Sequence, residues 1–124
     1  MRGSTADVPV TLESPDVVIH EAEWGEIHVG FETYHHAFDM APVLKGLPDD
    51  RCQCPHWGYV LKGRMVVTYG DREEIVNAGD AYYLPPGHSP TLDAGTELIE
   101  FSPKAAYQVT MEVAARNFEV MQQA

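Results

Sequence analysis

Three side chains that can bind a transition metal lie within five positions of one another: Cys52, Cys54 and His56. Their spacing of i, i+2 and i+4 would point all three toward one face of an extended strand, although Pro55 can bend the strand between them. Thiolate sulfur with imidazole nitrogen suits zinc, iron or copper much better than magnesium or calcium. The competing interpretation is a core face filled by two buried cysteines and a hydrogen-bonded histidine. Three such side chains in so short a segment favour a metal site.

The same two cysteines are the only ones in the sequence. A disulfide between residues two apart closes a small, strained ring. In a reducing compartment such thiols are better interpreted as metal ligands or redox groups. Both interpretations stay open at this point.

A second segment adds a fourth candidate ligand. The aromatic-rich run Ala81–Leu84 continues into the turn Pro85-Pro86-Gly87, which delivers His88 at its far end. Taken alone, His88 would be a histidine in a surface turn. Together with the first segment, it is a candidate metal ligand.

Aromatic side chains around both segments are candidates for the wall of a small-molecule pocket, because each combines an apolar body with a polar tip. Core packing explains them almost as well. The candidate pocket residues are Trp57, Tyr59, Tyr82 and His36. At most one of the adjacent His35 and His36 can face the interior, and an exposed pair is the simpler expectation. The other histidines expected to face solvent are His20 and His28.

Short β-rich runs separated by glycine-containing turns predict an all-β sandwich or barrel. The predicted strands are 16–24, 26–38, 56–61, 65–69, 81–84 and 96–101. In the last of these strands, Glu97 and Glu100 would point to opposite faces. We expect the inward-facing one to be tolerated only if it has a partner. The stretch 39–50 contains Pro42, Gly46 and Pro48 and is either a functional loop or a solvated crossover.

The end of the chain predicts a helix. Residues 104–122 contain neither glycine nor proline, and Ser102 with Pro103 forms a plausible N-cap and first helical position. Steps of four and three residues define an apolar stripe, which we expect to pack on the chain's own barrel rather than on a second subunit. The stripe consists of Tyr107, Met111, Ala114, Phe118 and Met121.

Composition narrows the possible functions. The 124 residues fit one domain, and 44% hydrophobic with 22% charged residues predicts a packed core. A formal charge of −11 makes nucleic-acid and membrane-surface roles unfavourable. Residues 1–5 lack the apolar run of a signal peptide, and no stretch reaches the roughly 18 apolar residues of a membrane span. We therefore expect a cytoplasmic protein that binds neither nucleic acid nor membranes.

The two segments together resemble the two motifs of the cupin superfamily. Tyr59-Val60-Leu61-Lys62-Gly63 is similar to the end of the first motif, and Gly79, Pro85 and Gly87 match the second at its own spacing. The resemblance covers roughly 16–101. It implies a cupin-type β-barrel, also called a jelly roll or double-stranded β-helix, here followed by a C-terminal α-helix. The parts would be an N-terminal arm at 1–15, the barrel at 16–101 and the helix at 102–124.

The chain departs from the family pattern at the ligands. Counting back from Gly63 places His56 at the family's glutamate, and Cys52-Gln53-Cys54-Pro55 then resembles the His-X-His-Pro that precedes it. If the family spacing is kept rigid instead, Cys52 takes the second histidine position and Cys54 lies between ligands. Pro90 stands where the second motif has its histidine, and His88 precedes it by two residues on the same strand face. The resemblance implies the ligand set Cys52, Cys54, His56 and His88, with zinc favoured over iron, copper or nickel.

The main functional hypothesis is a metal-dependent enzyme of the dioxygenase, isomerase or decarboxylase type that acts on a small molecule inside the barrel, as the resemblance implies. The alternative is a non-catalytic cupin that senses a metal, a redox state or a small ligand, because a closed set of four Cys and His ligands is typical of structural zinc. A metal-free structural barrel is the third hypothesis. The resemblance also implies a homodimer paired through sheet edges.

Overall fold

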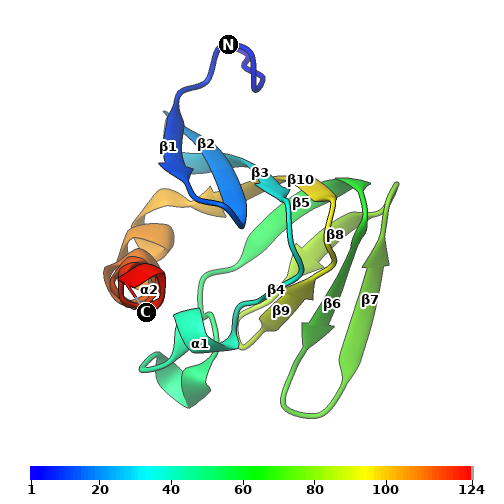
Figure 1. Ribbon diagram of the computed structural model, residues 1–124, viewed down its shortest axis with the longest axis vertical. Coiled ribbons are helices and arrows are strands. Elements are labelled where there is room, and N and C mark those ends of the chain that lie inside the picture. Colours follow the sequence, from blue (N-terminus) through cyan, green and yellow to red (C-terminus); the bar gives the residue numbers. More distant parts are fainter. Residues whose placement is uncertain (124) are drawn as a thin grey trace.

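The computed structural model describes residues 1–123, in which ten strands form two antiparallel sheets packed face to face (Figure 1). The first sheet has the strand order β1-β2-β3-β10-β5-β8 and the second has the order β4-β9-β6-β7. The strands of the first sheet are β1 (Val10–Glu13), β2 (Val17–Trp24), β3 (Ile27–Tyr34), β5 (His56–Lys62), β8 (Ala81–Leu84) and β10 (Thr96–Pro103). Those of the second are β4 (Phe38–Asp39), β6 (Arg64–Thr68), β7 (Glu73–Asn77) and β9 (Ser89–Leu92).

The strand β10 lies between β3 and β5 and brings distant parts of the chain together. Leu98 is opposite Glu32 of β3, and Glu100 is opposite both Gly30 of β3 and Gly58 of β5. Side chains alternate between the two faces of a strand. Alternate residues of β10 therefore face the other sheet, and Thr96, Leu98 and Ser102 are all buried there.

The core lies between the sheets. Val60 and Leu98 come from the first sheet and Met65, Val67 and Leu92 from the second, and each is at most 2% exposed. Such close packing of aliphatic side chains from both layers is the usual source of stability in a β-sandwich.

A long helix, α2 (Lys104–Gln123), lies alongside this sandwich (Figure 1). Ala114 is buried in the core cluster, and Met111, Phe118 and Met121 pack against it. The predicted stripe therefore packs on the chain's own barrel, as expected.

The stretch 39–50 is more ordered than expected. It contains the short helix α1 (Ala41–Leu44) and the 3-10 turn η1 (Pro48–Asp50). Val43 and Leu44 of α1 are buried, and α1 packs beside α2. The stretch is therefore part of the packed structure rather than a solvated crossover.

Several predicted boundaries need correction. The arm expected at 1–15 contains β1, which pairs with β2, and β7 and β9 are strands that were not predicted. The strand expected at 26–38 is divided between β3 and β4, which belong to different sheets. Ser102 lies within β10 and is no helix cap. Residue 124, the end of the predicted 102–124 segment, lies outside the described residues. Within 1–123, no helix combines the length and apolar character needed to cross a membrane.

Candidate metal centre

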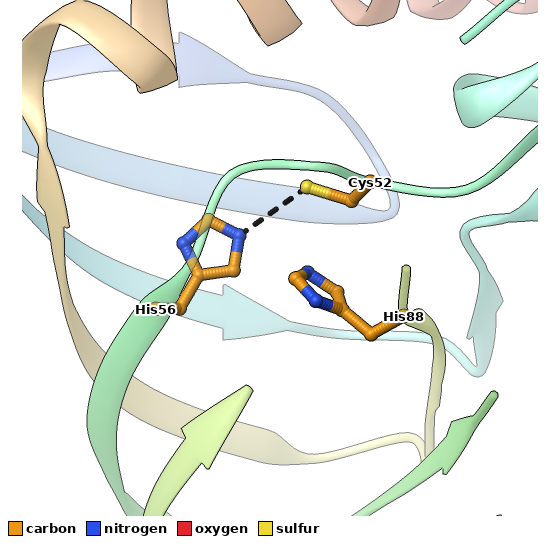
Figure 2. Close-up of side chains that lie close together, drawn as sticks. All are labelled: Cys52, His56 and His88. Atoms are coloured by element: carbon orange, nitrogen blue, oxygen red, sulfur yellow. Dashed lines mark hydrogen bonds between the residues drawn. The ribbon is translucent and has the colours of Figure 1, made fainter. Parts of the chain in front are cut away.

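Cys52, His56 and His88 point toward one another in the barrel interior (Figure 2). All three are buried, and each offers a ligand atom within 4.8 Å of the other two. The Cys52 Sγ lies 3.5 Å from His56 Nε2, and the two imidazole rings are 4.9 Å apart at 61°. Two such ligands in a tetrahedral zinc shell would be ~3.6 Å apart. The spacing therefore fits a single transition-metal ion.

Backbone hydrogen bonds hold Cys52 beside His88. The two residues form an isolated antiparallel bridge, in which the Cys52 N–H donates to the His88 carbonyl at 2.9 Å. The Gly87 N–H donates in turn to the Cys52 carbonyl at 2.8 Å. Gly87 has φ +96°, a conformation that glycine adopts at little cost, so the Pro-Pro-Gly turn sets the place of His88. His56 enters from the other side as the first residue of β5.

The Nδ1 atom of each histidine, on the side of the ring away from the candidate metal position, has a hydrogen-bond partner. His88 Nδ1 lies 2.7 Å from the Pro85 carbonyl. A carbonyl can only accept, so Nδ1 carries the proton and Nε2 is left with its lone pair free. His56 Nδ1 lies 2.6 Å from Ser102 Oγ and 3.6 Å from a Glu100 oxygen. Hydrogen bonds of this kind orient metal-binding histidines in proteins.

Burial decides the protonation of these groups without a metal. Burial, with a smaller contribution from His56, lowers the pKa of His88 to about 4. Burial, with a smaller contribution from His28, lowers the pKa of His56 to about 4 as well. Both imidazoles are therefore neutral near pH 7, the form that binds metals. Burial also raises the pKa of the Cys52 thiol to about 12. A bound cation would have to displace that proton.

Cys54 does not join this group. Its thiol donates to the Pro55 carbonyl at 3.5 Å, and the residue packs with Leu44, Leu47 and Cys52 in a small buried cluster. The structure does not place Cys54 with the other three as its parity predicted, because β5 begins only at His56 and the irregular backbone before it does not alternate. Three protein ligands would leave one position of a tetrahedral metal ion for water or substrate.

A cavity of about 340 Å³ lies next to the three ligands. Cys52, His56 and His88 form part of its wall, and the rest is mostly apolar and comes from both sheets, α1 and α2. The three candidate ligands therefore adjoin a space large enough for a small organic molecule.

The aromatic residues predicted for the pocket lie elsewhere. Trp57 and Tyr59 are on the outer face of β5, with 47% and 43% of their surface exposed, because their parity is opposite to that of His56. His36 is exposed and pairs with Asp16 at 3.2 Å. Tyr82 is buried but does not line the cavity. Its side chain lies across Gly58, and its hydroxyl donates a hydrogen bond to Glu100 at 2.8 Å.

The Tyr82 contact depends on Gly58. A Cβ at that position would lie 2.4 Å from the Tyr82 hydroxyl and 2.5 Å from the Ile99 carbonyl, closer than real Cβ atoms approach. Glycine thus allows the tyrosine to reach Glu100 from the next strand.

The cavity contains an acidic end that the sequence did not reveal. Glu32 and Glu100 both line the wall. Burial, followed by the charge of Glu100, raises the pKa of Glu32 to about 8, and burial raises that of Glu100 to about 7. Glu100 meets the expectation that an inward glutamate has a partner, and Glu97 pairs outside with Lys62. Glu32 lies two positions before the core residue Tyr34 in β3, so both side chains face the interior, and this alternation could have predicted the inward position of Glu32.

His28 corrects another prediction. It is only 8% exposed, stacks on Tyr107 of α2 at 3.5 Å and lies 2.6 Å from a Glu21 oxygen. The helix α2 covers this part of β3, which removes the histidine from solvent.

Comparisons with known proteins agree with this architecture. Residues 52–90 match a family profile described as "Cupin domain". A search of curated protein sequences finds no match. An RmlC-like cupin from Shewanella frigidimarina is 15% identical, with a TM-score of 0.56 over 82% of this chain and 88% of that one. A candidate mannose-6-phosphate isomerase from Ralstonia eutropha is 18% identical, with a TM-score of 0.56 over 83% and 97%.

A third structure, Fe(II)-HppE with the alternative substrate (S)-1-HPP, is 13% identical with a TM-score of 0.55 over 82% of this chain and 59% of that one. At these identities the likeness concerns the fold. The two facing antiparallel sheets with ligands converging inside them define a cupin-type β-barrel. The chain therefore has a cupin-type fold, and the segment that matches the cupin profile contains Cys52, His56 and His88.

Proposed function

We propose that this protein is a metal-binding cupin that acts as an enzyme on a small organic molecule inside its barrel. The observation that carries the proposal is a set of three ligands, Cys52, His56 and His88, beside a cavity of about 340 Å³. A closed structural zinc site has four protein ligands, whereas catalytic zinc sites commonly have three and an open position.

Zinc is the ion we favour, since one thiolate and two neutral imidazoles suit it. Iron is the second choice; the similar fold of HppE holds Fe(II). A divalent ion here would act as a Lewis acid toward a bound substrate or water. Ser102 and Pro85 would orient the two imidazoles, and the apolar wall would exclude water from the reacting groups.

The sensing alternative receives less support. Peroxide-responsive cysteines are accessible and have a lowered pKa. Both cysteines here are buried, and burial raises the pKa of Cys54 to about 11 and that of Cys52 to about 12. Without a metal, these thiols are therefore poor redox sensors.

Two cysteine variants test the ligand set. Protein purified without a chelating column should contain about one transition-metal ion per chain by elemental analysis. Cys52→Ser should lose that ion, and Cys54→Ser, the matched control, should retain it. Equal metal loss from both variants, or no metal in the parent protein, would contradict the proposed centre.

Cobalt substitution tests the open position. The visible spectrum of the Co²⁺ form should change when azide is added, because azide can occupy a coordination position that no side chain fills. An unchanged spectrum at saturating azide would indicate a closed structural site and would contradict the enzymatic proposal.

A further inference from the structure

The charge of the cavity wall limits what the cavity can bind. Most of the wall is aliphatic or aromatic, including Val17, Ile19, Phe38, Leu92 and Phe118. Such a surface favours the apolar part of a ligand by roughly 25 cal/mol for each Å² buried. The polar atoms of the wall are confined to the region of the metal ligands and the glutamates.

Glu32 and Glu100 lie side by side at this polar end. They come from the neighbouring strands β3 and β10, where they are diagonal partners, since Glu100 is opposite Gly30. No side chain separates them at Gly30, where a Cβ would lie 3.4 Å from Glu32 Oε2. The two carboxylates thus share one part of the wall.

Each of these carboxylates has only one hydrogen-bonded oxygen. Tyr34 donates to Glu32 Oε1, and Tyr82 donates to Glu100 Oε1 at 2.8 Å. Within residues 1–123, Glu32 Oε2 has no hydrogen-bond partner, and the Glu100 Oε2 approaches His56 Nδ1 no closer than 3.6 Å. An ionised oxygen without a donor is costly in a largely apolar cavity, so the free oxygens in this wall are sites for a donor from outside the chain.

The wall contains no lysine or arginine within the described part of the chain. Glu21, the third glutamate of the wall, already receives hydrogen bonds from Thr11 and Tyr107 and pairs with His28. With both Glu32 and Glu100 ionised, the polar end stays net negative even with a divalent ion on the Cys52 thiolate, and a bound cation would favour that ionised state. An anionic ligand would be repelled there, whereas a cation would be stabilised.

We propose that the cavity binds a small, largely apolar molecule carrying a protonated amine, which Glu32 and Glu100 hold beside the metal centre. The inference deepens the proposed function and rests on it for the neighbouring metal. Recognition of the amine by the two carboxylates does not itself require a metal.

Matched ligands test the preference for an amine. The first series of probes is 2-phenylethylamine, 2-phenylethanol and phenylacetate, which share a phenyl group. The second series is hexylamine, hexanol and hexanoate, which share an alkyl chain. Titration calorimetry at pH 7 should show at least one amine binding about tenfold more tightly than its alcohol, because a charged hydrogen bond is roughly twice as strong as a neutral one. The corresponding acid should bind more weakly than the alcohol to the metal-free Cys52→Ser protein.

Glu32→Gln locates the recognition. It should lower the affinity for the amine about tenfold and leave the affinity for the alcohol within about twofold. Glu97→Gln is the matched control, because Glu97 lies on the outer side of β10 and pairs with Lys62 at 3.2 Å. If Glu32→Gln does not fold by circular dichroism, Glu100→Gln provides the same comparison.

The outcomes separate this inference from the proposed function. Failure of both amines to bind better than their alcohols, or an unchanged amine affinity in the glutamine variant, overturns the inference even when one metal ion per chain is present. Amine binding to metal-free protein that never acquires a metal supports the inference and contradicts the proposed function.

Discussion

Ser102 contributes to the metal centre although it cannot bind the ion. Its hydroxyl is 2.6 Å from His56 Nδ1, and the residue is 1% exposed. A hydrogen-bond partner behind a ligating imidazole fixes the ring and its protonation state. Ser102 thus fixes the direction in which His56 Nε2 points.

Replacing Ser102 with alanine should weaken metal binding without unfolding the barrel. Mutating a residue that hydrogen-bonds to a metal-binding histidine typically lowers the metal affinity by about 10-fold to 100-fold, and we expect a loss in that range. Zinc affinity measured in competition with a chromophoric chelator checks the prediction. Ser89→Ala is the control, because the Ser89 hydroxyl forms no hydrogen bond within residues 1–123. Equal affinities of the two variants would contradict a role for Ser102.

The ligands show how far sequence reasoning reaches at this scale. The spacing to Gly63 singled out Cys52 and His56, the Pro-Pro-Gly turn singled out His88, and the fold brings these three candidate ligands together. Cys54 does not join them, because alternation holds only inside a strand and β5 begins two residues later. The partner role of Ser102 depends on a contact 46 positions away along the chain, which local spacing cannot reveal.

At the scale of elements, the missed strands have compositions that work against strand formation. β7 has two adjacent glutamates, and β9 contains Pro90. Both pair with β6, so the sheet overrides local preference. The strands that were predicted, such as β2 and β10, are rich in β-branched and aromatic residues. The helix α2 was predictable because its apolar stripe spans many turns.

Contacts to Glu21 fasten α2 to the sheet. Glu21 lies on β2 and receives hydrogen bonds from Tyr107 of α2 at 2.8 Å and from Thr11 of β1, and it pairs with His28 of β3. Burial opposes ionisation of Glu21, but these hydrogen bonds outweigh it and lower its pKa to about 2. Four elements are therefore held together by one ionised carboxylate.

Tyr107→Phe should loosen this attachment while keeping the stacking on His28. We expect the free energy of unfolding to fall by about 1.5–3 kcal/mol at pH 7, the typical value of a hydrogen bond to a charged group. A lowered pKa means that the ionised Glu21 stabilises the fold above about pH 4.5 and that this contribution is lost as pH falls toward 2. Urea unfolding should therefore show a smaller difference from the parent protein at about pH 3 than at pH 7.

Tyr59→Phe is the control for the Tyr107 variant, since Tyr59 is on the outer face and 43% exposed. It should change the free energy of unfolding by less than about 0.5 kcal/mol. A loss in Tyr107→Phe that did not depend on pH would show that the hydroxyl acts independently of the Glu21 charge.

For the whole molecule, the two ordered motifs indicated the barrel, and the composition indicated a packed, strongly acidic domain. The composition did not show that part of the acidic charge lies inside. Of 19 acidic residues, Glu21, Glu32 and Glu100 line the cavity, and the effect of Glu32 and Glu100 on stability is opposite to that of Glu21. The placement of Glu32 and Glu100 depends on the pairing of β3 with β10, which only the folded barrel reveals.

Above about pH 6.5, where the unfolded-state protonation of His56 and His88 no longer offsets the glutamates, the metal-free protein should become less stable as pH rises toward 8.5. Burial and the charge of Glu100 raise the pKa of Glu32 from 4.5 to about 8, so the folded state retains a proton that the unfolded state loses. Stability from this group is complete below about pH 4.5 and is lost as pH rises through 8. The other titratable groups near Glu32 are Tyr34 and His28 on β3, Glu21 on β2, Glu100 on β10 and Tyr107 on α2.

Glu32→Gln isolates this contribution, because glutamine has nearly the same shape and does not titrate. Its free energy of unfolding in urea should fall less steeply over the same pH range than that of the parent protein, and near pH 8 the variant should be the more stable of the two. Glu97→Gln removes a charge from the outer face of β10 and should preserve the parent slope. Parallel pH profiles for the parent protein and Glu32→Gln would mean that the surroundings of Glu32 do not disfavour its ionised form.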